Sequence, residues 1–156
     1  MQGSVLGLNR HADGTVYASR KRSRSDTRCR DRAGHRDDEM NAIQPLTKDQ
    51  LDALLREGEF PESVRLAAPK VVVIMTQDWC GQWANMAAYL PDFADQAAIF
   101  TVEYNLLPDF ERIMSFKEDV LNNQQVPYLR FYRDGKLVRQ SNWLPRASFA
   151  AVLGRE

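Results

Sequence analysis

The chain has 156 residues, 44% of them apolar, and its 21 basic and 21 acidic side chains give a formal net charge of zero. This length fits one domain with a real core plus an extension. The charge balance gives no reason to expect a nucleic acid or a membrane as partner, and no apolar run is long enough to cross a bilayer. The two cysteines do not make a disulfide framework, and such sparse cysteine is typical of a cytoplasmic protein, which is the location we expect.

Residues 1–39 differ in composition from the rest of the chain. They are rich in arginine and small polar residues, contain few large apolar residues after Leu8, and lack the apolar stretch of a secretory signal. Such a sequence cannot bury enough surface to fold, so we predict a disordered basic tail at 1–39 and a folded domain at 40–156. The interspersed acids argue against a nucleic-acid arm. A second hypothesis is that translation starts at Met40, which the intact mass of the endogenous protein would decide.

The first folded element is predicted at residues 46–55. Thr47 is followed three residues later by Gln50, which is the spacing of a capping box at a helix start. Three leucines at helical spacing give one apolar face: Leu51, Leu54 and Leu55. Gly58 and Pro61 then end the segment, so we expect an amphipathic helix.

A continuous apolar run at residues 70–76 predicts a central strand that is covered on both faces. A helix is expected from residue 80 to about residue 98, and Pro91 either kinks it or starts a second segment. Residues 99–104 are the next predicted strand. Because a strand, a helix and a strand follow one another, the two strands are expected to pair in parallel.

The second half of the chain predicts two helices and a hairpin. Residues 108–120 have helical apolar spacing, and residues 126–132 read as a strand. The pair Asp134-Gly135 is a hairpin turn signal, which sends residues 136–140 back antiparallel. Residues 145–153 form the last predicted helix. The order indicates an α/β fold with a central mixed sheet of about four strands flanked by helices.

Cys80 stands where the helix after the first buried strand begins. The unpaired N–H groups and positive dipole end of a helix favour a thiolate there, so Cys80 is the candidate nucleophile. The second cysteine of a Cys-x-x-Cys motif is absent, and Trp83 takes its place. Asp78 and Glu103, if close to the sulfur, would oppose the thiolate by repulsion. Cys29 lies in the tail with no motif around it, and we do not expect it to resolve a disulfide of Cys80.

Other catalytic chemistry has little support in residues 40–156. Both histidines, His11 and His35, lie in the tail. Ser-His-Asp and Cys-His nucleophile systems are therefore excluded from the folded part, and too few nitrogen and sulfur ligands remain for zinc. No phosphate-binding loop or dinucleotide fingerprint is present. We expect neither a metal nor a bound cofactor.

Three features occur in the order found in thioredoxins: Trp79-Cys80-Gly81 after a buried strand, Val126-Pro127 before the hairpin strand, and the hairpin sequence Tyr-Arg-Asp-Gly-Lys-Leu. Over most of its length outside the tail, the chain therefore resembles the thioredoxin family. The resemblance implies a thioredoxin-like fold. It also implies that Pro127 follows a cis peptide bond and faces Cys80, and that the backbone of Val126 pairs with a bound peptide as an added strand.

The departures from that family concern the second half of the dithiol cycle. Trp83 replaces the cysteine that resolves the mixed disulfide, and Ile74 replaces the buried acid that helps proton transfer. Glu103 aligns with a lysine often found near that acid, and Gln82 replaces the proline between the cysteines. Ordinary dithiol disulfide reductase activity is therefore not expected.

The first functional hypothesis is monothiol exchange in cell redox homeostasis. Cys80 would attack or carry a mixed disulfide with glutathione or a protein thiol, and an external thiol such as glutathione, as co-substrate, would release it. The residues expected to bind the substrate are Trp79, Gly81, Trp83, Val126 and Pro127.

The alternative hypothesis is a binding module without catalysis. In it, the groove of Trp79 and Val126-Pro127 docks a client peptide after the chemistry has been lost. A third interpretation is that Cys80 is a buried, reduced residue that only packs.

Overall fold

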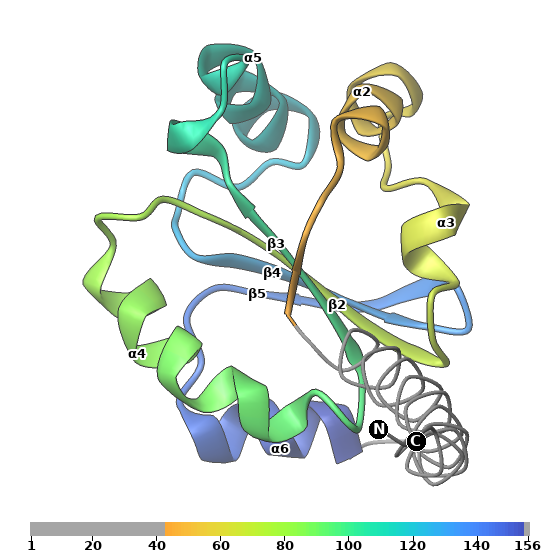
Figure 1. The fold of residues 1–156 in the computed structure, drawn as a ribbon, viewed down its shortest axis with the longest axis vertical. Helices are drawn as coiled ribbons and strands as arrows, with labels where there is room; N and C mark the ends of the chain where they lie inside the picture. Colours follow the sequence, from red (N-terminus) through yellow and green to blue (C-terminus); the bar gives the residue numbers. More distant parts are fainter. Residues whose placement is uncertain (1–42, 155–156) are drawn as a thin grey trace, which may run out of the picture. The chain divides into compact units, whose positions relative to one another are not determined.

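The fold is built on a five-stranded mixed sheet, described by a computed structural model for residues 43–154 (Figure 1). The strand order is β1-β3-β2-β4-β5. The bounds are β1 Gln44–Pro45, β2 Lys70–Thr76, β3 Ala98–Glu103, β4 Tyr128–Arg133 and β5 Lys136–Ser141. The predicted mixed α/β sheet is confirmed, with five strands in place of about four. The predictions for the tail, for Cys29 and for a start at Met40 lie outside the described residues.

The central strand β2 leads directly to Cys80. Every residue of β2 from Val71 to Thr76 is buried, as a strand covered on both faces requires. It pairs in parallel with β3, where Ile74 lies opposite Thr101, and antiparallel with β4, where Ile74 lies opposite Leu129. The turn that follows β2 therefore lies at the C-terminal end of the central strand, between β3 and β4.

Helices cover both faces of the sheet. They are α2 Lys48–Glu57, α3 Glu62–Arg65, α4 Gly81–Tyr89, α5 Phe110–Ser115 and α6 Arg146–Gly154. In Figure 1, α2, α3 and α5 lie on one face and α4 and α6 on the other. Alternate residues of β2 serve the two layers: Val71 and Val73 join the core under α2 and α5, and Val72 and Ile74 join the core under α4 and α6. None of these helices is long and apolar enough to cross a membrane.

The predicted caps of α2 are confirmed. The Thr47 hydroxyl accepts a hydrogen bond from the Gln50 amide at 3.2 Å, and the Gln50 side chain accepts one from the Thr47 amide at 2.9 Å. Gly58 ends the helix at φ 80°, in the left-handed region that glycine adopts without strain. Local sequence therefore sets both ends of this helix.

Several bounds differ from the predictions. The short strand β1 and the one-turn helix α3 were not expected, and neither is long enough to carry a periodic signal. The helix that starts after Cys80 ends at Tyr89, and Pro91 falls in the short 3₁₀ turn η1 (Leu90–Phe93), since proline has no N–H to continue the helical bonds. The helix predicted at 108–120 is instead α5 followed by a wider, π-type turn, η3 (Phe116–Val120).

Candidate functional site

Cys80 is the N-cap residue of α4. Its amide donates to Gln77 O at 3.1 Å, and its carbonyl accepts from the Ala84 amide at 3.1 Å, so the residue closes the turn and opens the helix. The thiol makes no capping hydrogen bond, and the first turn of α4 contains no acidic residue. The free N–H groups of this turn therefore favour a negative charge close to the sulfur.

The Cys80 sulfur faces the start of β4. Sγ lies 3.8 Å from Val126 O, a distance at which the thiol donates a weak hydrogen bond to the carbonyl. This carbonyl belongs to the Val126–Pro127 peptide bond, which is cis. Val126 is half-buried, Pro127 is buried, and Cys80 is 7% exposed. Three of the six residues named for this site in the sequence, Cys80, Val126 and Pro127, are thus brought together.

The two tryptophans of the motif have opposite environments. Trp83 is 8% exposed and packs with Cys80 in the core under α4, where it fills the space one helical turn after the thiol. Trp79 is 69% exposed and presents its ring to solvent immediately before Cys80. Gly81 is exposed, and nothing lies within 4 Å of the place where a Cβ would stand. The site therefore has a closed wall at Trp83 and an open, partly aromatic side at Trp79 and Gly81.

The turn before Cys80 is braced from the neighbouring strand end. Gln77 Nε2 donates to the Tyr104 hydroxyl at 2.9 Å, and the Asp78 amide donates to Asn105 Oδ1 at 3.0 Å. Asn105 Nδ2 in turn donates to the Asp78 carboxylate. Both partners belong to η2 (Tyr104–Leu106), the 3₁₀ turn that follows β3. Burial raises the pKa of Tyr104, so the phenol stays neutral and accepts the Gln77 hydrogen bond.

These contacts were not predicted, because the partners are 27 residues apart and neither turn has a recognisable motif. They also alter the expectation for Asp78, whose carboxylate is engaged by the Asn105 amide. Glu103, the other acid considered, ends β3 beside Thr76 and is half-buried.

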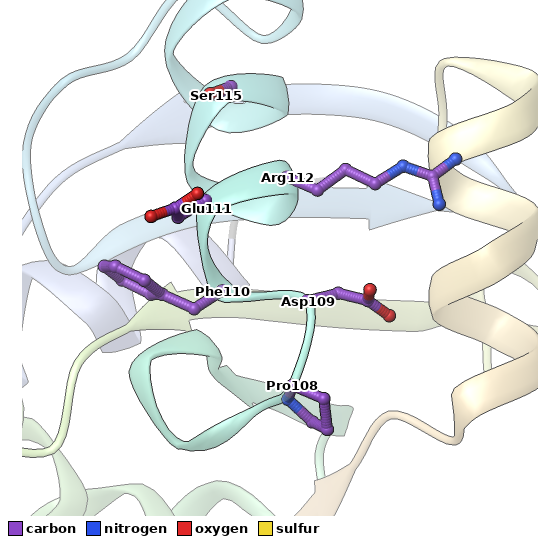
Figure 2. Close-up of a pocket in the computed structure, with 6 residues that line it drawn as sticks. All are labelled: Pro108, Asp109, Phe110, Glu111, Arg112 and Ser115. Carbon is purple, nitrogen blue, oxygen red and sulfur yellow. The ribbon is translucent and has the colours of Figure 1, made fainter.

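Two depressions in the surface of the described residues lie away from Cys80. Figure 2 shows an open one of about 750 Å³ at the start of α5, where the Arg112 side chain extends toward α2. A smaller one of about 220 Å³ lies between α2 and the end of β3. Neither includes Cys80, and within residues 43–154 no group of three potential metal ligands comes together. The Cys80 thiol is therefore the candidate reactive group of the site.

The fold is similar to that of solved thioredoxins. Thioredoxin O2 from Arabidopsis thaliana, in the oxidised state, has a TM-score of 0.54 at 14% identity, over 72% of this chain and 92% of that chain. A mutant thioredoxin from Halobacterium salinarum has a TM-score of 0.53 at 17% identity, over 73% and 89%. The short form of spinach chloroplast thioredoxin f has a TM-score of 0.53 at 15% identity, over 73% and 92%.

No protein-family model matches the sequence, and no curated protein matches it. At these identities the likeness to solved structures concerns the fold alone. The chain has a thioredoxin-like fold.

Proposed function

We propose that this protein carries out thiol–disulfide exchange with Cys80 as its single active-site thiol. The observation that carries the proposal is the position of Sγ, at the first turn of α4 and 3.8 Å from the carbonyl of the cis Val126–Pro127 bond. The solved neighbours are thioredoxins, and thioredoxin O2 is described in the oxidised state, which supports redox chemistry of the same general kind. Trp83 offers no second thiol, so the cycle is monothiol.

The exchange has two balanced steps. The Cys80 thiolate attacks one sulfur of a disulfide, the S–S bond breaks, a Cys80 mixed disulfide forms, and the other sulfur leaves as a thiolate. An external low-molecular-weight thiolate, such as that of glutathione, then attacks the substrate's sulfur in the mixed disulfide. Cys80 leaves as the thiolate, and the external thiol departs in a new disulfide with the substrate.

The substrate is held by the residues around the sulfur. The exposed Trp79 ring gives an apolar contact, and Gly81 leaves room for a chain to pass. An extended peptide adds to the backbone of Val126 and replaces the weak thiol bond to its carbonyl, while Trp83 forms the inner wall. Because Cys80 is largely covered, extended disulfide peptides reach the sulfur better than bulky folded surfaces do.

The test uses a glutathionylated peptide and two matched variants. Cys29→Ser keeps Cys80, and Cys80→Ser keeps Cys29, so the pair separates the two thiols of the chain. We expect Cys29→Ser to form a mixed disulfide, seen by intact mass, about tenfold faster than free cysteine at pH 7, because the residues around the sulfur hold the peptide beside it. Cys80→Ser, which keeps Cys29, should form one no faster than free cysteine does.

A rate in Cys29→Ser no faster than that of free cysteine would contradict the proposal. If Cys80→Ser still binds the peptide as tightly as the native chain while neither thiol reacts faster than free cysteine, the protein is a docking module and not an exchange catalyst.

A further inference from the structure

Lys117 is a buried cation that is hydrogen-bonded to the loop before β4. It lies in η3 with no exposed surface, and burial lowers the pKa of its ammonium group. Its Nζ donates to Asn123 O, and none of the ion pairs among residues 43–154 includes it. A fully buried lysine is rare unless it is paired, because desolvation of the charge is costly. The bond that Lys117 donates to Asn123 O is therefore the contact that partly compensates its buried charge.

That carbonyl anchors the loop at residues 121–127. The Asn123 amide donates back to Lys117 O at 3.1 Å, so the two residues hold each other through a side-chain and a backbone bond. Asn123 Oδ1 accepts from the Gln125 amide at 3.0 Å, which shapes the next stretch of the loop. A hydrogen bond from an ammonium group is stronger than one from a neutral donor, so the Lys117 bond is the firmest of this set.

The same network continues to the residue beside the sulfur. The side-chain amides of Asn123 and Asn142 exchange two hydrogen bonds, at 3.2 and 3.1 Å. Asn142 Nδ2 also donates to Pro127 O at 3.1 Å. Pro127 follows Val126, whose carbonyl faces Cys80 Sγ. A chain of hydrogen bonds therefore runs from the buried ammonium group through Asn123 and Asn142 to Pro127, which is next to the residue that faces the sulfur.

We propose that Lys117 is a positioning residue, which holds the loop at 121–127 so that the Val126 backbone stays opposite the Cys80 sulfur. The expected effect on thiol–disulfide exchange rests on the proposed function, whereas the expected effect on the order of the loop does not. An apolar side chain of the same length would fill the space but would leave Asn123 O without its donor. The loop would then lose its fixed relation to the sulfur.

The first experiment measures amide hydrogen exchange in the native chain and in Lys117→Met. We expect the backbone amides of the loop at 121–127, and the Gln125 amide in particular, to exchange about tenfold faster in the variant. The reason is that the bond from Lys117 to Asn123 O, which anchors the loop, is gone. The order of exchange rates among the β2 amides should be the same in the variant as in the native chain. Lys48→Met, at an exposed lysine, is the control and should leave the loop as in the native chain.

The second experiment compares two reagents for Cys80 in the Cys29→Ser background. A glutathionylated peptide must dock beside Val126, whereas iodoacetamide needs only access to the thiol. We expect Lys117→Met to slow the peptide reaction about tenfold and to leave alkylation within about twofold. A residue that merely supports the fold would change both rates alike.

Asn142→Ala cuts the network at its other end and provides the answer if Lys117→Met does not fold. It should show the same faster amide exchange in the loop, and it should slow the peptide reaction while leaving alkylation nearly unchanged. Unchanged loop exchange in a folded variant overturns the proposal, as does an equal effect on the two reagents. If the Cys29→Ser chain reacts with the peptide no faster than free cysteine does, the proposed function fails, and loop exchange alone decides the role of Lys117.

Discussion

Two cations are buried in the described part of the molecule, and their surroundings differ. Arg130 contacts the Glu59 carboxylate and donates to the Tyr132 and Tyr128 hydroxyls at 2.8 and 3.0 Å. Burial raises the pKa of Tyr132, so that phenol stays neutral beside the guanidinium. Lys117 has instead a backbone carbonyl and no carboxylate within ion-pair distance among residues 43–154. Arg130 is thus electrostatically compensated, and the charge of Lys117 weighs on stability.

This difference predicts a pH dependence at Lys117. Burial lowers its pKa in the folded chain below the ordinary 10.5, and the neighbouring Glu118 only partly opposes this. As the pH rises, the folded state loses this proton before the unfolded state does, so the unfolding free energy rises with pH up to about 10.5. We expect the native chain to gain up to about 1.4 kcal/mol per pH unit relative to Lys117→Met in that range.

Guanidinium unfolding of both proteins between pH 7 and 10 measures this gain. Groups other than Lys117 titrate in both proteins, so the difference between the two curves isolates the lysine. Curves that stay parallel over the whole range would mean that the ammonium group keeps its ordinary proton affinity.

At the scale of elements, α2 is stabilised by its own sequence. Thr47→Ala removes the hydroxyl that accepts from the Gln50 amide and breaks the capping box. We expect a loss of about 1 kcal/mol in the unfolding free energy. Thermal or denaturant unfolding measures it, with Ser63→Ala, an exposed serine of α3, as the control that should change stability by less than about 0.5 kcal/mol. Equal effects of the two substitutions would show that the cap contributes nothing.

Elements with a local signal were predictable from the sequence. The capping box at Thr47, the valine run of β2 and the Asp134-Gly135 turn each specify structure within a few residues, and all three are where they were expected. The widened turn η3 was not predictable, because the apolar spacing of residues 108–120 is compatible with an uninterrupted helix. Strand β1 is only two residues long and exists through its pairing with β3.

At the scale of the whole molecule, the candidate site is assembled from separate stretches of the chain. The turn after β2 carries Cys80, the loop before β4 carries Val126, η2 braces one side, and Asn142 after β5 braces the other. The resemblance to thioredoxins pointed to the first two. The bracing amides could not be found in the sequence, since they pair across 19 and 27 residues and only the folded sheet brings them together.

One aromatic ring joins the layer that carries this site. Phe149 of α6 is fully buried, with ring centroids 5.1 Å from Phe93 and 5.7 Å from both Tyr89 and Phe131. The ring therefore contacts α4, η1 and β4 at once. Its loss leaves a cavity that the surrounding rings cannot close without moving α6.

We expect Phe149→Ala to lower the unfolding free energy by about 3–5 kcal/mol, and Val152→Ala, at a half-buried position of the same helix, by about 1 kcal/mol. The two layers share one sheet, so the loss should appear in a single cooperative transition. Circular dichroism and trapping of the Cys80 thiol, followed in the same denaturant series in the Cys29→Ser background, should then give coincident midpoints in Phe149→Ala. Thiol exposure at a lower denaturant concentration than the loss of helix would instead mean that the α4–α6 layer opens on its own, ahead of the sheet.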